Sequence, residues 1–535
     1  MTAPADRPLA AEFFELFKTP WEPALPGRHY RVVLSTRGYP HGIDADVFIV
    51  YGSKEEGVDR NTTAAVIETA GPADVHWNDA VIPIYGSIAC LSGSTVDAIF
   101  TSQGLPVDWR CHADGRAIHR IGYDLFTELR HLLTEGQPAS KAITPALELH
   151  IAALRDVLRQ TRVSFIEIPP RPAACDFVCC LTHDIDFYEI RRHKADRTLA
   201  GFAMRASVGT FIDLARGRRT PTEAIRNWIA CASLPLVFVG LARDLWRPFE
   251  DYERVEDGKR STFFIVPFKN RPGQDANAQS DARRAVPYQA SEICDDVRAA
   301  VTRGCEIAVH GIDAWRDADA GRDELAQVAA VTGKPSAGVR MHWLYFASDS
   351  PRQLEAAGFD YDSTWGYNDA VGYKAGTSQV FRLAGADSLL ELPLAIMDSA
   401  LLFPGRMGLS SDDAIRECRP ILANAKQFGG TVVINWHDRS LSPERLWNRT
   451  YEHLLQEING SGDVWFCGAA EAVQWFRWRR SIRFEATGCS TISVTSATRN
   501  TSLPAAVVRT YRNDASPTRI EERQFTGGEP LRLDV

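Results

Sequence analysis

The sequence predicts an α/β protein in three parts, and three observations lead to this prediction. Between Phe177 and residue 478, strand-like apolar runs alternate with helical segments, a pattern typical of a parallel sheet or barrel. The pattern changes on both sides of this stretch, so flanking domains are expected at 1–165 and 480–535. A length of 535 residues also exceeds what one ordinary hydrophobic core supports.

Residues 1–165 are predicted to form a small α/β domain of unknown role. Short apolar runs such as "YRVVLST" and "DVFIVYG" are separated by turn signals, and the amphipathic segments 122–134 and 144–160 follow them. No motif in this part has a clear chemical meaning. The proline-rich stretch 164–176 is expected to be a linker.

Residues 177–478 are predicted to form the main domain. Gly304 stands where one helix would end, and Ser350 with Pro351 stands where another would begin. A long and mostly helical segment at about 187–260 interrupts the alternation and is expected to be an insertion. The strand-like runs lie at 177–182, 261–268, 306–311, 337–343, 389–396 and 431–438.

Residues 480–535 are predicted to form a small β domain. The runs "SIRFEA", "STISVTSA" and "LRLDV" alternate apolar with polar residues between glycine, asparagine and proline turn signals. This alternation is typical of antiparallel strands with one face in solvent.

Composition and charge exclude several classes of protein. The formal net charge is −8, and no block of lysines and arginines indicates a nucleic-acid partner. The first thirty residues lack a basic start followed by an apolar core, so no secretory signal is expected. The eleven cysteines are therefore expected to be reduced, and the protein to be cytoplasmic.

No membrane span is predicted, because no apolar run reaches eighteen uninterrupted residues. The nearest candidate, 228–246, contains Pro235 and Arg243 and is too short to span a bilayer. We expect a buried helix there, with a peripheral membrane contact as the alternative.

Polar residues gather where the predicted parallel strands end. The first strand ends in "HDID", which places His183, Asp184 and Asp186 together. The loops after parallel strands meet at one edge of the sheet, which is where active sites of such folds lie. Later strands end in His310, in Arg340 and His342, and in His437 and Asp438.

These residue types suit metal-assisted hydrolysis. Asp184 and Asp186 are two apart on an extended chain and therefore point the same way. Their repulsion is relieved if one carboxylate binds a divalent metal while the other takes a proton. Histidines from neighbouring strands can complete a three-ligand site, and a bound metal makes water nucleophilic near neutral pH. A separate histidine can protonate a leaving amine.

The motifs resemble those of the polysaccharide deacetylases, the NodB-homology group of carbohydrate esterase family four, over about 177–478. The resemblance implies a distorted (β/α) barrel, with Asp184 as catalytic base and Asp186 as metal ligand. It also implies His310, in "VHGIDAW", as the second ligand. Ala314 stands where the family has its second histidine, so the third ligand departs from the pattern.

Two candidates remain for that third ligand, His342 and Asp313. His342 is favoured because imidazole suits a zinc-type site, whereas Asp313 could simply cap the next helix. The resemblance further implies that Arg340 orients the base and that His437 is the general acid. It assigns supporting roles to Ile434, Asp362 and Trp365, the first of them at the acetyl pocket.

Taken singly, these residues also have structural interpretations. His183 is expected to be hydrogen-bonded near the site rather than a ligand. His310 alone would more often be structural, and Arg340 alone could belong to a salt bridge. The prediction therefore depends on several strand ends coming together.

The expected function is removal of N-acetyl groups from amino sugars of a polysaccharide or glycan precursor. The reaction class is hydrolysis of carbon–nitrogen bonds other than peptide bonds. The expected cofactor is a divalent metal, with zinc favoured and cobalt, manganese or nickel as alternatives, and the expected partner is an N-acetylated glycan. Three alternatives stay open: an O-acyl esterase, an amidase acting on non-sugars, and a glycan-binding protein with a degenerate site.

Overall fold

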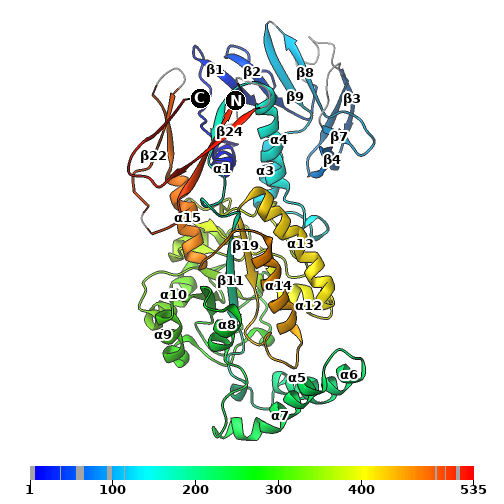
Figure 1. Ribbon diagram of the computed structural model, residues 1–535, viewed down its shortest axis with the longest axis vertical. Coiled ribbons are helices and arrows are strands. Elements are labelled where there is room, and N and C mark those ends of the chain that lie inside the picture. Colours follow the sequence, from blue (N-terminus) through cyan, green and yellow to red (C-terminus); the bar gives the residue numbers. More distant parts are fainter. Residues whose placement is uncertain are drawn as a thin grey trace.

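The computed structural model describes residues 6–36, 38–55, 65–92, 99–113, 115–487, 491–500, 502–513 and 518–534. The molecule is elongated, as Figure 1 shows. The N-terminal and C-terminal strands lie together at one end, a large sheet with helices on both sides occupies the middle, and a group of helices projects from the other end.

A large, curled and mostly parallel sheet organises the middle of the molecule. Its strand order is β16-β17-β15-β14-β13-β12-β11-β19-β18, with β20 pairing β11, and only β16 is antiparallel. The edge strands β16 and β18 do not pair, so the sheet is a half-barrel rather than a closed barrel. The strands are β11 (Phe177–Ile185), β12 (Ser261–Ile265), β13 (Glu306–Gly311), β14 (Val339–Met341), β15 (Tyr361–Asp362), β16 (Phe381–Arg382), β17 (Leu390–Glu391), β18 (Ile396–Met397), β19 (Thr431–Asn435) and β20 (Val464–Phe466).

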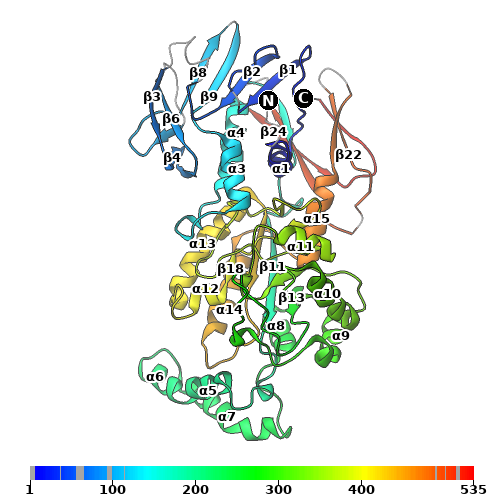
Figure 2. The same ribbon diagram turned by 180° about the vertical axis from the view of Figure 1, so that it is seen from behind.

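Strand β11 lies at the centre of this sheet, between β12 and β19. All nine of its residues are buried, which explains the nearly continuous apolar run from Phe177 to Leu181. Helices surround the sheet, and in Figures 1 and 2 α12–α14 lie to one side of β11 and α9 and α10 to the other. These helices are α9 (Cys294–Thr302), α10 (Ala318–Thr332), α11 (Ser350–Ala357), α12 (Asp398–Leu402), α13 (Ser411–Phe428), α14 (Trp447–Ser461) and α15 (Ala469–Ser481).

The segment predicted as an insertion is helical. It holds α5 (Arg197–Met204), a π-helical turn (Arg205–Gly209), α6 (Thr210–Ala215), α7 (Pro221–Phe238) and α8 (Pro248–Glu256). The first four project beyond the end of β11 (Figure 1). The expectation of a buried helix at 228–246 is wrong for one face of α7, where Trp228 and Ile229 are exposed. Among the described residues, no helix combines the length and apolar character needed to cross a membrane.

The N-terminal part contains more β structure than the sequence pattern suggested. A sheet of order β1-β2-β9-β8 is joined by the pair β3-β6 and the sheet β5-β4-β7, and helices α1, α3 and α4 pack beside them. The elements are α1 (Arg7–Phe17), β1 (His29–Ser35), β2 (Asp44–Tyr51), β3 (Ala65–Ala70), β4 (Ala73–Trp77), β5 (Ala80–Ile84), β6 (Ile88–Ser92), β7 (Ile99–Thr101), β8 (Asp108–Ala113), β9 (Arg116–Ile121), α3 (Leu125–Thr134) and α4 (Ala146–Gln160).

The C-terminal strands are antiparallel and contact the N-terminal half of the chain. Strand β10 (Phe165–Glu167) lies within the stretch predicted as a linker and pairs with β23, so that stretch is partly ordered β structure. Two three-stranded sheets result, β21-β22-β25 and β10-β23-β24. Their remaining strands are β21 (Arg483–Ala486), β22 (Thr491–Thr495), β23 (Ala506–Arg512), β24 (Arg519–Phe525) and β25 (Leu531–Asp534).

Candidate metal centre

Three side chains from neighbouring strand ends meet beyond the centre of the large sheet. Asp186 directly follows β11, His310 belongs to β13, and His342 directly follows β14. Their candidate ligand atoms all lie within 4.8 Å of one another. Asp186 Oδ1 is 3.3 Å from His310 Nε2 and 3.3 Å from His342 Nε2. The parallel strand order β11-β12-β13-β14 places these three chain positions at one edge.

The chemistry of this cluster fits a divalent cation. Asp186 Oδ1 is buried and makes no hydrogen bond, which leaves an uncompensated partial charge for a cation to satisfy. His310 Nδ1 lies 2.9 Å from the Arg340 carbonyl oxygen; donation there leaves Nε2 as a lone-pair donor toward the cluster. Burial lowers the pKa of His342 to about 3, which keeps its imidazole neutral. One carboxylate and two neutral imidazoles are ligands that zinc and similar ions accept.

Asp313, the other candidate for the third ligand, lies outside this cluster. Its Oδ1 accepts a hydrogen bond of 3.0 Å from the Gln274 amide. Immediately after His342, Trp343 and Leu344 have φ values of 65° and 55°, a left-handed backbone that is unusual for non-glycine residues. This local turn is where the chain leaves β14, and such strained positions are enriched at functional sites.

Asp184 lies beside the cluster and is held by two partners. Arg340 Nη1 donates to its Oδ1 at 3.0 Å, and Asn435 Nδ2 donates to its Oδ2 at 2.6 Å. The same Oδ2 is 3.9 Å from His310 Nε2. Burial would raise the pKa of Asp184, but the neighbouring His310, Arg340 and His437 outweigh it and hold the pKa below its ordinary value.

Arg340 is itself fully buried and fixed by four further contacts. It donates to Thr182 Oγ1 at 2.8 Å and to the carbonyl and hydroxyl oxygens of Ser363 at 3.0 and 2.9 Å, and it stacks over the Phe264 ring. A guanidinium so constrained presents the second N–H of Nη1 to Asp184 in one orientation.

His437, which follows β19, is paired with Asp398. Its Nδ1 is 2.6 Å from Asp398 Oδ1, and its backbone amide donates to Asp398 Oδ2 at 2.8 Å. Its Nε2 is 3.9 Å from Asp186 Oδ2. Burial would lower the pKa of His437, but the Asp398 carboxylate outweighs this and raises it to about 9.

Sequence reasoning missed Asp398 and Asn435. Asp398 is fully buried and follows β18 directly, so it lies at a strand end like the residues that were predicted. The signal was available, because a carboxylate two residues past the apolar run 389–396 obeys the same rule. Asn435 ends β19, two residues before His437, and an asparagine there carries no distinctive pattern.

The remaining predicted residues lie around the centre rather than in it. His183 points to the opposite side of β11, where its Nε2 is 2.9 Å from Glu256 Oε1. The Asp438 carboxylate accepts from the Phe187 and Tyr188 amides at 2.6 and 2.7 Å and so fixes the loop after β11.

The three residues expected to support the site are buried in the sheet around Arg340. Ile434 lies within β19, opposite Leu181 of β11. Asp362 accepts a hydrogen bond of 3.0 Å from the Thr364 amide, and the Trp365 amide donates to Glu391 Oε1 at 2.9 Å. Ser363, which holds Arg340, lies between these last two residues.

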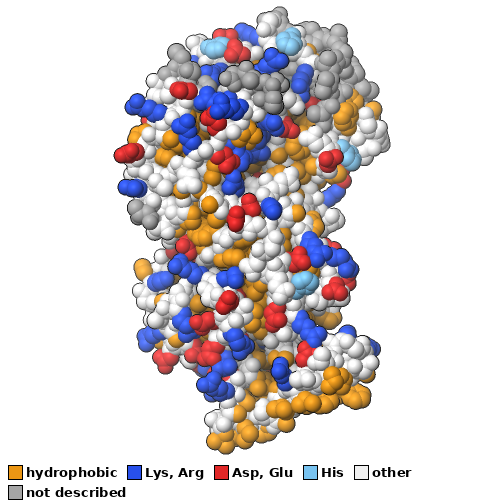
Figure 3. Space-filling view, viewed as in Figure 1, with side chains coloured by type: hydrophobic (Ala, Val, Ile, Leu, Met, Phe, Trp, Pro, Cys, Tyr) orange, Lys and Arg blue, Asp and Glu red, His pale blue; other side chains and the backbone are white. Residues whose placement is uncertain are grey.

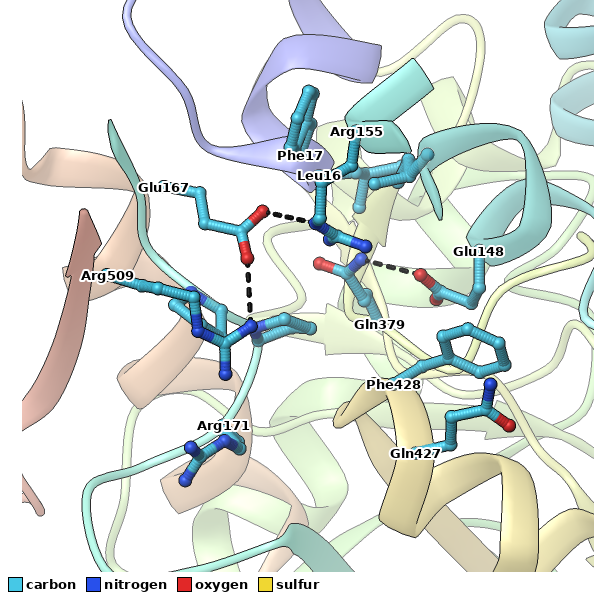
Figure 4. A pocket seen from close by; sticks show the side chains of 13 residues that line it. Leu16, Phe17, Glu148, Arg155, Glu167, Arg171, Gln379, Gln427, Phe428 and Arg509 are labelled. Carbon is cyan, nitrogen blue, oxygen red and sulfur yellow. Dashed lines mark hydrogen bonds and ion pairs between the residues drawn. The ribbon is translucent and has the colours of Figure 1, made fainter. Parts of the chain in front are cut away.

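Two hollows lie elsewhere. An open groove of about 400 Å³ runs beside the loop after β13 and is lined by Arg271, Pro272, Gly273, Gln274, Ser280, Asp313, Arg316, Asp317 and Ala320. A cavity of about 50 Å³ lies where α1, α4, β10 and β23 meet. In Figure 4 its charged groups are paired with one another, Glu167 with Arg155 and Arg509. That pairing indicates a structural junction rather than a reaction site.

Comparisons with known proteins find similarity only among solved structures. No family model matches the chain, and no curated protein matches it. A putative polysaccharide deacetylase from Mycobacterium smegmatis is 21% identical with a TM-score of 0.34, over 58% of this chain and 95% of that one. A probable polysaccharide deacetylase from Pseudomonas aeruginosa PAO1 is 16% identical with a TM-score of 0.35, over 58% and 94%. Puue allantoinase is 14% identical with a TM-score of 0.34, over 57% and 92%.

Proposed function

We propose that this protein is a metal-dependent hydrolase that removes N-acetyl groups from amino sugars of a polysaccharide or glycan precursor. One observation carries the proposal. Asp184 and His437 flank the Asp186, His310 and His342 cluster, each within 3.9 Å of it, and each is held by a partner of opposite charge. A base and an acid beside a metal site are the groups that amide hydrolysis requires.

Asp186, His310 and His342 would hold the cation. When bound, a divalent ion supplies Lewis-acid chemistry, polarising the acyl carbonyl and lowering the pKa of water. Asp184 accepts a proton from the attacking water, and Arg340 and Asn435 keep its two oxygens oriented for that transfer.

His437 donates a proton to the leaving nitrogen. Its pairing with Asp398 raises its pKa to about 9, so the imidazolium is populated near neutral pH. Asp398 also fixes the ring through Nδ1, which leaves Nε2 as the donor toward the site. The overall reaction adds water across the amide, giving a carboxylic acid and a free amine.

The surroundings favour a sugar as the group that carries the amide. Trp343, partly exposed next to His342, offers a ring face for stacking.

Acetate release from N-acetylglucosamine oligomers, compared with release from O-acetylated glycans, tests the reaction class. We expect release from the N-acetylated substrate. Preferential release from the O-acetylated glycan would make the protein an esterase. Absence of release from either, with sugar binding retained, would leave a binding protein.

The substitution Asp184→Asn tests the role of the base. The amide keeps the shape of the side chain and leaves Asp186, His310 and His342 in place, so metal content should stay near that of the wild type. The rate should fall by about a hundredfold or more with loss of the general base. Asp313→Asn is the matched control, a nearby aspartate outside the cluster, and should keep both properties. A fully active Asp184→Asn variant would contradict the assignment.

A further inference from the structure

The helices that project beyond β11 carry apolar side chains on their outer surface. On α5, the π-helical turn and α6, Met204, Val208, Phe211 and Ile212 are 40–64% exposed. They recur every three to four residues and therefore form one stripe. A second stripe on α7 consists of Ile225, Trp228, Ile229 and Leu236, with exposed fractions of 39–62%.

The two stripes do not form the hydrophobic core of this helical group, because other side chains on the inner side of the helices form that core. Phe202, Ala206, Val237 and Trp246 are buried and pack together on the inner side. The buried Asn227 side chain donates to Thr210 Oγ1 at 2.8 Å and fixes α7 against α6. Figure 3 shows the outer stripes as a continuous apolar band at the end of the molecule. Bands of this kind on soluble domains mark a docking surface.

The segment that carries the band is basic, although Arg192, Arg205 and Arg247 are paired with Glu292, Glu444 and Glu250 outside it. Residues 191–247 carry eleven arginines and lysines against four aspartates and glutamates, a formal net charge of +7 in a chain of −8. Arg216, Arg226 and Arg243 are exposed, and within the described part of the chain their side chains make no ion pair. Basic residues bordering an apolar face rich in Phe, Trp and Ile are the signature of helices that lie in the interface of an anionic bilayer.

We propose that α5–α7 form a docking element for the surface of an anionic lipid bilayer. The apolar stripes would enter the boundary between headgroups and acyl chains, and the arginines would reach the lipid phosphates.

The docking element is attached beside the candidate metal centre. Trp246 Nε1 donates to Ser442 Oγ at 3.1 Å, and Arg219 Nη1 donates to the Pro443 carbonyl at 2.7 Å. Both acceptors belong to the loop that follows His437. Docking would therefore hold the carboxyl edge of the large sheet, with His437, toward the lipid surface. The lipid contact itself does not depend on catalysis.

Vesicle flotation of the full chain tests this proposal. We expect at least about tenfold stronger binding to vesicles of phosphatidylcholine mixed with phosphatidylglycerol than to phosphatidylcholine alone, weakening as salt is added. The double variant Phe211→Ser/Ile229→Ser should lose at least about tenfold in binding, because it removes one large apolar group from each stripe. The triple variant Arg216→Gln/Arg226→Gln/Arg243→Gln should lose the preference for phosphatidylglycerol.

The matched control is Leu25→Ser/Ile520→Ser, which removes two exposed apolar side chains far from the helical group and should bind like the wild type. Because the substituted side chains are exposed, thermal unfolding should be unchanged in all variants. Failure to bind the anionic vesicles at low salt overturns the proposal, as does equal binding to both vesicle types. A dimer in light scattering that Phe211→Ser/Ile229→Ser dissociates, without vesicle binding, would assign the band to a second copy of this chain.

Discussion

At the residue scale, two carboxylates two positions apart on one strand meet different neighbours. Asp184 contacts a guanidinium and an amide that donate to its oxygens, so its orientation is fixed and its hydrogen bonds are satisfied. Asp186 keeps a buried oxygen without a hydrogen bond, facing two imidazole nitrogens. The first environment suits a group that exchanges a proton, and the second suits a metal ligand.

Asp398→Asn should move the alkaline limb of the pH–rate profile to lower pH. The Asp398 carboxylate raises the pKa of His437, and a neutral amide removes that effect. With His437 as the proposed general acid, loss of its proton would slow protonation of the leaving amine, so the wild-type rate should fall as pH rises toward about 9. A cation bound nearby would lower the pKa of His437, so the alkaline limb would lie below pH 9 in both proteins. Profiles of kcat/KM from pH 5 to 10 measure the shift, and superimposable profiles would show that Asp398 does not tune His437.

The sequence pattern predicted which strand-end residues lie close together. It did not predict the residues that only orient or charge another side chain of the site. Parallel strands end at one edge of a sheet, and from this rule we predicted that six residues would lie close together: Asp184, Asp186, His310, Arg340, His342 and His437. Their chemical roles remain predictions. Asp398 and Asn435 were missed because they follow or end short strands and act on another side chain. Such partners become visible only once the strands are placed in space.

At the element scale, β13 and α10 are joined by a buried carboxylate. Glu324 on α10 is fully buried and accepts from the Ile312 and Asp313 amides at 2.9 and 2.7 Å, just after β13 ends. This contact fixes the loop that follows His310. Burial raises the pKa of Glu324 from 4.5 to about 7.

This shift predicts a pH dependence of stability that Glu324→Gln should remove. The folded state holds the Glu324 proton more tightly than the unfolded state. The contribution of this proton to the free energy of unfolding is therefore full below pH 4.5 and is lost as pH rises to about 7. The amplitude is roughly 3 kcal/mol. Denaturant unfolding at several pH values measures this amplitude. The free energy of unfolding should fall less steeply between pH 4.5 and 7 in the variant than in the wild type. Equal slopes in the two proteins would show that Glu324 is ionised when folded.

The strands of the molecule differ in how well the sequence pattern predicts them. The run "EIAVHG" coincides with β13, because its centre, Ile307 to Val309, is apolar and buried on both faces. The run 389–396 instead splits into β17 and β18, which pair with different neighbours. Strand β24, "RIEERQF", was missed because most of its side chains are polar and exposed. Tertiary pairing, not local pattern, determines these elements.

At the scale of the whole molecule, the first and last segments of the described chain meet around one buried carboxylate. Glu167 of β10 is fully buried and contacts Arg155 of α4 at 2.8 Å, Arg509 of β23 at 3.0 Å and the Tyr511 hydroxyl at 2.8 Å. Figure 4 shows the two arginines converging on it. The predicted N-terminal and C-terminal parts are therefore joined by specific polar contacts through β10, which lies in the stretch predicted as a linker.

Glu167→Gln should destabilise the whole chain while leaving the metal centre intact. Two arginines would lose their buried counter-charge, which should cost about 2 kcal/mol and lower the unfolding midpoint of a chain of this size by roughly 2 °C. Glu522→Gln removes an exposed partner of the same Arg509 and should change the midpoint little. Calorimetry with metal analysis makes the comparison. An unchanged midpoint in Glu167→Gln would mean that this junction contributes no stability.

Metal content of the purified full chain tests the central claim most directly, namely that Asp186, His310 and His342 hold a divalent cation. Elemental analysis after dialysis against a limiting zinc concentration should find close to one ion per chain in the wild type and in Asp313→Ala. In His342→Ala the zinc affinity should fall at least about tenfold, because one of three ligands is removed. Equal occupancy in the two variants, or loss of the ion in Asp313→Ala alone, would contradict the account.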